Sequence, residues 1–327
     1  NQAMLSLDGL ERLVCRCQET GKRLIWTLHD IWPATGICHL PQRCTRWESG
    51  CGCCPKLKCN VLTRLLPLCG RSDNDISKRI FQRKQQIYRQ GHITFVACSR
   101  YLADMVRRSP LMKGQTVTDI ANPIDTCFFF PFSSPGEKEA LRSTLSLPTG
   151  KTILLFVAYN VNDANKGFGT FAQAVESLIV RQPQLRENIC VVAVGRHATT
   201  HRKDFACEMI PFEYIAERST MRDIYRASDI FTMVSIMENL PNTIVEAKAC
   251  GLPVVATAVG GIRQMVREGT DGFLVPPADS QAFSEALEKA IQHPRRQDLA
   301  TAARLDAEDT YDTAKVAQRY LALYQGE

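Results

Sequence analysis

The chain has 327 residues, of which 45% are hydrophobic and 23% charged, and it carries a formal net charge of +6. This composition excludes a disordered or fibrous protein, and the length suffices for two globular domains. No run of about 18 or more apolar residues is present, which excludes a membrane-spanning helix. Because no signal peptide is visible at the N-terminus, we expect a cytoplasmic protein.

Basic residues are concentrated in the first part of the chain. Residues 1–130 hold 19 Lys and Arg against 10 Asp and Glu, and residues 56–89 hold nine against two. One interpretation of the 56–90 segment is a solvated helix face. The other is contact with a phosphorylated acceptor or with anionic lipid, which would make the protein peripheral at the inner face of the membrane. No nucleic-acid motif is present, so we expect no nucleic-acid partner.

Apolar runs and helical patterns alternate along the chain, as in parallel βαβ units. In the first part we expect helices at 8–20 and 100–109, strands at 23–30, 93–99 and 116–125, and a Pro/Ser/Gly-rich linker at 131–139. In the second part we expect strands at 151–159, 189–195, 230–235, 253–257 and 272–277. Helices are expected between them near 167–181, 219–227, 242–250, 261–268 and 280–292.

The second part is thus a complete doubly wound unit, whereas the first has too few strands for one. We predict a partial N-terminal Rossmann-like domain over 1–135 with a Cys-rich insert at 38–59. A C-terminal Rossmann-like domain is predicted over 136–310, and a helix at 311–327 is expected to return to the N-terminal domain.

The segment "SIMENLPNTIVEAKACGLPVVATAVGG" is the most informative one. Glu238 follows a predicted strand, and Glu246 lies about one turn into the next helix. Unpaired backbone N–H groups near Asn239 and Leu240, at the helix start, can hold a phosphate or sugar hydroxyls. The Glu246 carboxylate can accept two hydrogen bonds from a vicinal diol such as a ribose.

This segment resembles the retaining glycosyltransferases of family 4, which have the GT-B fold, an α/β fold of two Rossmann-like domains facing a cleft. The matching residues are Ser235, Glu238, Pro241, Glu246, Ala247, Gly251, Pro253, Gly260 and Gly261. The resemblance implies that Glu246 binds the nucleotide ribose and that Glu238 lies beside the transferred sugar, with Ser235 also at the donor site.

A second segment, "YNVNDANKGFGTF", follows the first strand of the C-terminal domain. Family members place a Lys-Gly pair there, which implies that Lys166 and Gly167 contact the donor diphosphate. The family often has an arginine six residues before the lysine, but this chain has Asn160. Arg196, at the end of the next strand, is a weaker candidate for the nucleotide cleft.

The resemblance implies a mechanism without a protein nucleophile and without a catalytic metal. Negative charge builds on the leaving diphosphate, and Lys166 with the N–H groups near Asn239 and Leu240 would stabilise it. The acceptor hydroxyl attacks from the same face and gives its proton to the leaving phosphate.

The stretch "WTLHDIWPATGICHLPQRCTRWESGCGCCP", in the N-terminal part of the chain, combines a His-Asp pair with five cysteines. The family's N-terminal domain has a strand that ends in His-Asp, which implies that His29 faces the transferred sugar and the acceptor. The cysteine pattern resembles one subgroup, which includes the colanic-acid-type exopolysaccharide transferases. Cys38, Cys44, Cys51 and Cys54 suit a tetrahedral structural zinc, with unligated thiols and disulfides as alternatives. Cys53 and Cys59 lie outside the pattern.

We therefore predict a retaining hexosyltransferase that uses a UDP- or GDP-sugar and a lipid-linked or oligosaccharide acceptor in exopolysaccharide or surface-glycan synthesis. The alternatives are a non-catalytic or truncated sugar-nucleotide-binding remnant, because the N-terminal glycine-rich loop and first strands of the family are missing, and a sugar-nucleotide 2-epimerase, which shares the fold.

Overall fold

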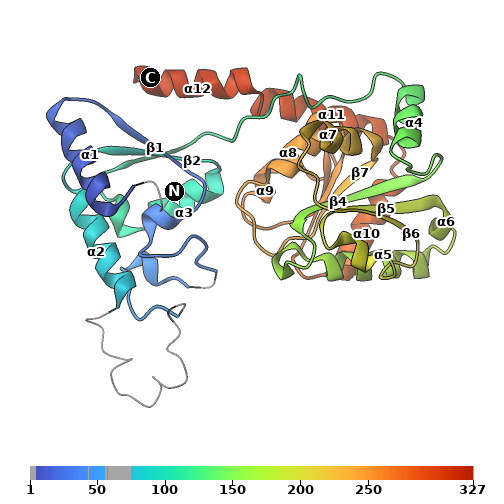
Figure 1. The fold of residues 1–327 in the computed structure, drawn as a ribbon, viewed down its shortest axis with the longest axis horizontal. Helices are drawn as coiled ribbons and strands as arrows, with labels where there is room; N and C mark the ends of the chain where they lie inside the picture. Colours follow the sequence, from blue (N-terminus) through green and yellow to red (C-terminus); the bar gives the residue numbers. More distant parts are fainter. Residues whose placement is uncertain (1–4, 43, 56, 58–74, 327) are drawn as a thin grey trace, which may run out of the picture. The chain divides into compact units, whose positions relative to one another are not determined.

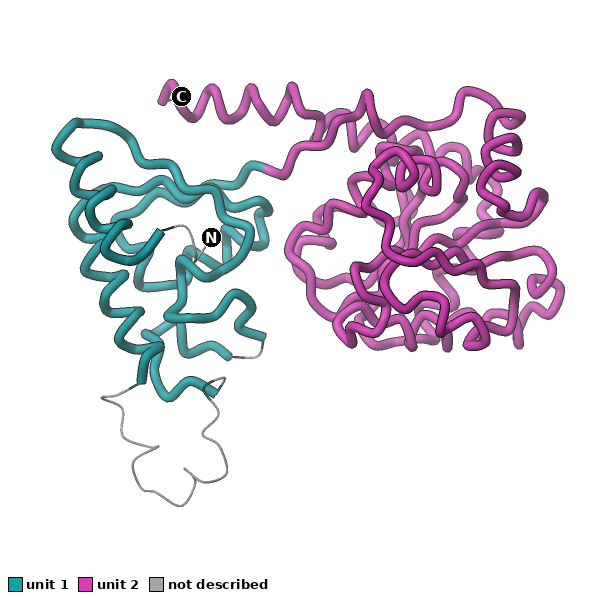
Figure 2. The backbone as a smooth tube through the Cα atoms, in the orientation of Figure 1, with its two compact units in different colours: residues 1–120 teal, residues 121–327 magenta. Residues whose placement is uncertain are grey.

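The structure is a computed structural model that describes residues 5–42, 44–55, 57 and 75–326. The chain divides into two compact units, unit 1 from Asn1 to Ile120 and unit 2 from Ala121 to Glu327 (Figure 2). This division falls about 15 residues before the domain boundary that the sequence suggested. In the described part of the chain, no helix combines the length and apolarity needed to cross a membrane.

Unit 1 contains a three-stranded parallel sheet of order β1-β2-β3. The strands are Leu24–Leu28, Ile93–Ala97 and Thr116–Asp119. The helices are α1 (Leu7–Glu19), α2 (Ile76–Tyr88) and α3 (Arg100–Arg107). Helices α1 and α2 pack on each other, and α3 packs on β2 and β3 (Figure 1). Helix α1 begins after Ser6, whose side chain accepts a hydrogen bond from the Gly9 amide at 3.0 Å, a typical N-cap.

Unit 2 is built on a six-stranded parallel sheet of order β6-β5-β4-β7-β8-β9. Its strands are Thr152–Asn160 (β4), Ile189–Arg196 (β5), Glu208–Phe212 (β6), Ile230–Met233 (β7), Val254–Thr257 (β8) and Gly272–Val275 (β9). The central strands are apolar and buried, as parallel strands covered on both faces require. From β4 the strand order runs outward through β5 and β6 on one side and through β7, β8 and β9 on the other. The topological switch point of the sheet therefore lies between β4 and β7.

Helices cover both faces of this sheet (Figure 1). One layer contains α5 (Phe168–Arg181) and α10 (Ser280–Ile291), which pack on each other. The other contains α4 (Pro135–Thr144), α7 (Arg218–Ala227), α8 (Asn242–Ala249) and α11 (Arg296–Thr310). The short helices α6 (Leu185–Asn188) and α9 (Ile262–Met265) and the last helix α12 (Thr313–Gln325) complete the unit.

Four features of the fold differ from the sequence prediction. The segment expected as a linker over 131–139 becomes helix α4 at Pro135, because Ser134 caps it by accepting from the Glu137 amide and the Glu137 carboxylate accepts from the Ser133 amide. Strand β6 and helix α11 were not predicted. The helix expected over 261–268 extends only over Ile262–Met265.

The basic 56–90 segment is described only at residue 57 and from residue 75 onward, so much of it lies outside the described residues, Cys59 included. Most of its described part is helix α2. One face of α2 is not solvated, because Phe81, Lys84, Ile87 and Tyr88 are buried. The solvated-face interpretation is therefore wrong for Lys84, and it holds for exposed residues such as Arg79 and Arg89.

Candidate active site

Two loops at the carboxyl ends of β4 and β7 bring Lys166 and Glu238 together. The Lys166 ammonium lies 2.5 Å from the Glu238 carboxylate, although the two residues are 72 positions apart. Ser235, which is buried, donates to the same carboxylate oxygen at 2.9 Å. The sequence predicted all three residues at the donor site, and the structure places them in mutual contact.

Backbone packing explains why these loops meet. Gly167 has a φ of 68°, and a Cβ there would lie 2.2 Å from the Val234 carbonyl oxygen. Only glycine therefore fits between β4 and the end of β7. Asn165 fixes the contact, since its carbonyl accepts from the Ile236 amide at 2.8 Å and its side chain donates to the Met237 carbonyl at 2.9 Å.

Glu246 lies in α8, the helix that follows β7. Its carboxylate accepts a hydrogen bond of 2.8 Å from the Tyr225 hydroxyl on α7. Burial raises the pKa of Glu246, and the Tyr225 hydrogen bond opposes this rise. Burial also raises the pKa of Tyr225, with the Glu246 charge adding to it, so the hydroxyl remains a donor. The second carboxylate oxygen of Glu246 can accept from a ligand hydroxyl.

Other predicted donor residues lie in the loop before α8 and at the end of β4. Leu240 is buried and Asn239 half-buried, both in the loop that leads to α8, which begins at Asn242 without a side-chain cap. Asn160 ends β4, where its side chain accepts from the Asn162 amide at 2.9 Å. A neutral side chain therefore occupies the position where family members often have arginine.

Arg196 ends β5 beside Asn160 in the strand register. Its guanidinium carbon lies 4.6 Å from the centre of the Tyr159 ring and 5.9 Å from that of Tyr214. Both tyrosines are exposed, and their rings meet edge to face at 5.3 Å. The sequence analysis named Arg196 but not the two tyrosines that contact it, and it did not name Tyr225 or Asn165. Of these residues, only Asn165 could have been found from the sequence, because it directly precedes Lys166.

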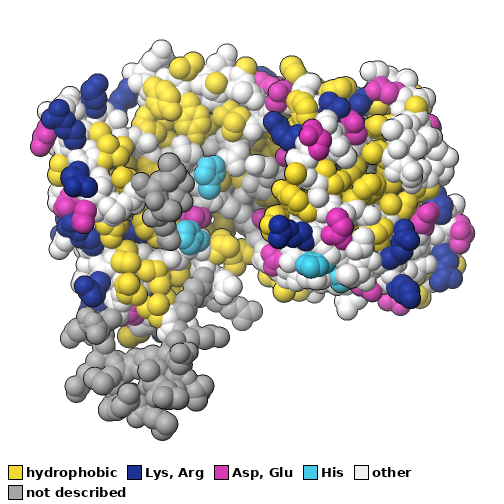
Figure 3. Space-filling model, in the orientation of Figure 1, with side chains coloured by type: hydrophobic (Ala, Val, Ile, Leu, Met, Phe, Trp, Pro, Cys, Tyr) yellow, Lys and Arg dark blue, Asp and Glu magenta, His cyan; other side chains and the backbone are white. Residues whose placement is uncertain are grey.

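His29 lies in unit 1, directly after β1, and lines a cavity of about 470 Å³. Trp26, Trp32, Asp30 and His39 line the same cavity, and on the face of unit 1 seen in Figure 3 histidine side chains lie beside apolar ones. The His39 Nδ1 atom lies 2.7 Å from the Asp30 carboxylate, whose other oxygen accepts from the Trp32 amide at 2.7 Å. The His39–Asp30 pair was not predicted.

The four cysteines predicted to hold zinc, Cys38, Cys44, Cys51 and Cys54, line one small cavity of about 10 Å³. All described cysteines are free, so these four form no disulfide. Burial raises the pKa of the Cys51 thiol, and the nearby thiols add to this effect. Nevertheless, no group of three or more His, Cys, Asp or Glu among the described residues is arranged to hold a metal ion. The four cysteines line one cavity, but as they lie among the described residues they do not fit a zinc site.

Solved structures show which class of fold this is. HepE of Anabaena in complex with UDP superposes with a TM-score of 0.70 over 98% of this chain and 77% of its own, at 16% identity. Sucrose-phosphate synthase of Thermosynechococcus elongatus superposes with a TM-score of 0.62 over 98% of this chain and 78% of its own, at 17% identity. The fold is therefore that of the GT-B glycosyltransferases, with parallel sheets in two Rossmann-like α/β units, and the predicted fold class is confirmed.

Sequence comparison then addresses unit 2. Residues 151–293 match the family model described as "Glycosyl transferases group 1". The D-inositol 3-phosphate glycosyltransferase 2 of Catenulispora acidiphila is 32% identical over 174 residues, which are 50% of this chain and 40% of that protein. The D-inositol 3-phosphate glycosyltransferase of Rhodococcus opacus is 32% identical over 171 residues, 50% of this chain and 38% of that protein.

The chain thus spans less than half the length of these relatives. Their names refer to D-inositol 3-phosphate, whereas the cysteine pattern resembles an exopolysaccharide subgroup. The subgroup stays a prediction.

Proposed function

We propose that the protein is a retaining glycosyltransferase that transfers a hexose from a nucleotide sugar to a lipid-linked or oligosaccharide acceptor in exopolysaccharide or surface-glycan synthesis. One observation carries this proposal. The Lys166–Glu238–Ser235 contact lies at the carboxyl ends of β4 and β7 in a doubly wound sheet, where such folds bind nucleotides, and Glu246, which accepts from Tyr225, lies in the helix that follows β7. The similarity of residues 151–293 to group 1 glycosyl transferases supports it.

Each side chain has a role in this proposal. Glu246, oriented by Tyr225, accepts hydrogen bonds from the ribose hydroxyls. Lys166 is neutralised by Glu238 when no donor is bound, and the donor diphosphate replaces Glu238 as its partner. Glu238 is then released toward the transferred sugar, which develops positive character as its bond to the leaving phosphate breaks.

The reaction requires no protein nucleophile. The bond between the anomeric carbon and the diphosphate oxygen breaks, and the acceptor oxygen bonds to that carbon on the same face. The acceptor proton goes to the leaving phosphate. His29, in the cavity of unit 1, is proposed to face the transferred sugar and the acceptor. Asn239, Leu240, Gly167 and Arg196 are proposed to contact the donor.

UDP-sugars are the first donors to test, because HepE was solved with UDP and with UDP-glucose. Release of UDP or GDP from a panel of nucleotide sugars, with lipid-linked, oligosaccharide and inositol phosphate acceptors, measures the transfer. Configuration of the product at the anomeric carbon tests retention. Conversion of the donor to its 2-epimer without transfer would indicate the isomerase, and donor binding without either reaction would indicate the remnant.

Three variants test the roles at the donor site. We expect Lys166→Ala to weaken UDP binding by about tenfold or more and uridine binding little, because the charge acts on phosphate. Glu238→Gln should bind UDP at least as tightly as the parent, since Lys166 loses its carboxylate partner, while turnover falls. The matched control is Lys203→Ala, an exposed lysine that should change neither. Equal losses for UDP and uridine in Lys166→Ala would contradict the phosphate role.

A further inference from the structure

A second cavity lies at the opposite edge of the unit 2 sheet, where the strands begin. It has a volume of about 300 Å³ and lies between the chain segment before α4, the turn after α8 and the first turns of α11. Asp229 and Pro253, which precede β7 and β8, line it, whereas the candidate donor site lies where β4 and β7 end. The two sites are thus separate features of one unit.

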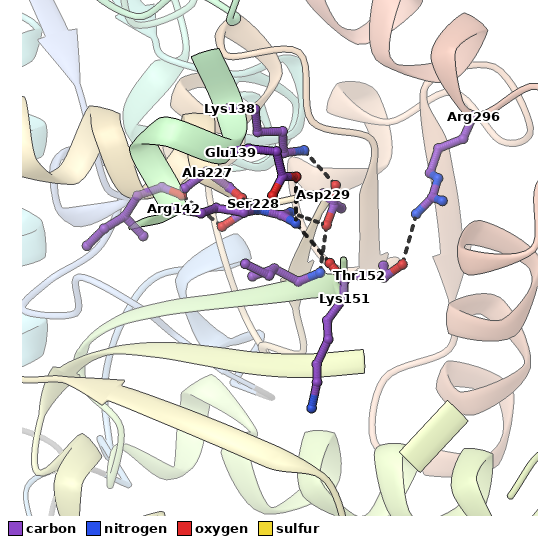
Figure 4. Close-up of polar contacts among 11 residues, drawn as sticks. Lys138, Glu139, Arg142, Lys151, Thr152, Ala227, Ser228, Asp229 and Arg296 are labelled. Atoms are coloured by element: carbon purple, nitrogen blue, oxygen red, sulfur yellow. Dashed lines mark hydrogen bonds and ion pairs between the residues drawn. The ribbon is translucent and has the colours of Figure 1, made fainter. Parts of the chain in front are cut away.

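The inner wall of this cavity contains an ion cluster (Figure 4). The Asp229 carboxylate is shared by the Lys138 ammonium at 2.5 Å and the Arg142 guanidinium at 2.6 Å, and it also accepts from the Ile153 amide at 2.7 Å. Burial lowers the pKa of Lys138, and the charges of Arg142 and Arg296 act in the same direction. Cations therefore crowd this wall.

Arg296 is the residue whose charge is not balanced. It is half-buried in the cavity wall, and its guanidinium donates only a long hydrogen bond of 3.4 Å to the Thr152 hydroxyl (Figure 4). No carboxylate of the described residues lies within ion-pair distance of it, in contrast to Arg304 in the same cavity, which lies 2.6 Å from Glu308. A partly desolvated cation without a partner is unfavourable, so this position favours an anion.

The surroundings of Arg296 favour an anion as well. Arg296 is the first residue of α11, a helix of 15 residues whose N-cap side chain makes no capping hydrogen bond. The positive end of the helix dipole therefore lies in the cavity wall. Ser228, Gln297 and Thr301 line the remainder together with apolar residues such as Phe132 and Leu252, so no further carboxylate besides Asp229 is among the described lining residues.

We propose that this cavity binds a small phosphate ester, with the phosphate at Arg296 and Lys138 and the organic part against the Phe132 side. The volume is at the lower end for small-molecule sites and suits a ligand the size of a hexose phosphate. Because the cavity is separate from Lys166 and Glu238, the ester does not compete with the donor nucleotide.

Isothermal titration of the full chain with glucose 6-phosphate at low salt tests this proposal, in parallel with glucose and inorganic phosphate, and with UDP at saturation. We expect the ester to bind, glucose not to bind, and inorganic phosphate to bind more weakly than the ester. Arg296→Gln should weaken ester binding by about tenfold or more, because a charge-assisted contact is lost.

The matched control is Arg295→Gln, whose side chain pairs with Asp298 at 3.5 Å and does not line the cavity, and which should change affinity less than twofold. Thr301→Phe fills the cavity from the exposed side of α11 without changing charge and should also abolish ester binding. Lys166→Ala should leave ester binding unchanged, so failure of the donor-site proposal would not affect this result.

The proposal is overturned if the parent does not bind the ester at millimolar concentration or if UDP displaces it. Equal effects of Arg296→Gln and Arg295→Gln would also overturn it, as would inorganic phosphate binding as tightly as the ester.

Discussion

Each unit contains a lysine with no solvent exposure, and the two units stabilise that buried charge in different ways. In unit 1, Lys84 donates to the backbone carbonyls of Trp32, Thr35 and Gly36 at 2.6, 2.8 and 3.3 Å, and its ammonium lies 3.3 Å from the centre of the Trp32 ring. In unit 2, Lys248 lies 3.1 Å from Asp271 and 2.5 Å from Asp306, and it donates to the Met265 carbonyl at 2.5 Å.

The difference shows what each lysine organises. Lys84 holds one continuous segment, residues 32–36, which begins two residues after Asp30. The Lys84 ammonium is stabilised by carbonyl dipoles and by the face of the Trp32 ring, so substitution of Lys84 leaves no buried carboxylate without a partner. Lys248 joins α8, which carries Glu246, to the turn before β9 and to α11. It uses full charges, and Asp271 is itself completely buried. The free energy of unfolding of unit 2 should therefore depend more strongly on Lys248 than that of unit 1 depends on Lys84.

The largest effect is expected for Lys248→Met. Loss of the ammonium leaves Asp271 buried with only Arg267 to balance it, and breaking such a buried pair costs about 3–5 kcal/mol. All three tryptophans lie in unit 1. The urea midpoint followed by far-UV circular dichroism should therefore decrease, while the midpoint followed by tryptophan fluorescence should not change. Lys289→Met, at an exposed position of α10, is the control and should change little. Equal shifts for the two variants would contradict the ion-pair argument.

A smaller loss is expected for Lys84→Met, about 1–3 kcal/mol, because three carbonyls lose a donor but no charge is left unpaired. Tryptophan fluorescence is the right probe, since Trp32 lies against the lysine. Arg79→Met, exposed on the same helix, serves as the reference. A loss as large as that of Lys248→Met would remove the contrast between the two units.

The third prediction concerns pH. Because burial raises the pKa of Glu246, its carboxylate becomes protonated at a higher pH than the ordinary value of about 4.3. UDP affinity should therefore be highest near neutral pH and fall as the pH decreases, beginning at a higher pH than for an ordinary glutamate, because a hydrogen bond to the ribose is lost when the carboxylate is protonated. In Glu246→Gln the affinity should be lower at neutral pH. The ratio between the parent and this variant isolates Glu246 from titration of UDP itself, and a ratio independent of pH would refute the assignment.

The smallest effect is expected from the excess of basic residues in unit 1. Vesicles with anionic lipid should bind the protein weakly at low salt and release it near physiological salt, whereas neutral vesicles should not bind. Arg79→Gln combined with Arg89→Gln, at an exposed position of α2 and at its exposed C-cap, should weaken this binding. Arg202→Gln in unit 2 should not. Binding that is insensitive to salt would show that charge is not the cause.

Much of unit 2 could be predicted from the sequence, because buried parallel strands are short apolar runs with a clear signal. Five of its strands were expected close to where they lie. Strand β6 was missed because it is an edge strand with Pro211 in it, a residue that edges tolerate and that weakens the pattern. In unit 1 the cysteine spacing predicted that four thiols come together, and they do line one cavity, but the spacing could not show how the sulfurs are oriented.

The sequence by itself determined the features that short segments encode. The hydrophobic period predicted the alternating strands and helices of unit 2, and the resemblance of two short segments to family 4 implied the GT-B fold class and the places of Lys166–Gly167, Glu238 and Glu246. These signals are local, since each lies within one short segment of the chain. Only the tertiary structure decided that Lys166 is paired with Glu238, that Tyr225 donates to Glu246, and that Lys248 has two carboxylate partners while Arg296 has none among the described residues. Each of these depends on which side chains from distant segments meet in a place of low solvent access. Charge pairing there follows from packing across the sheet, and no periodicity along the chain encodes it.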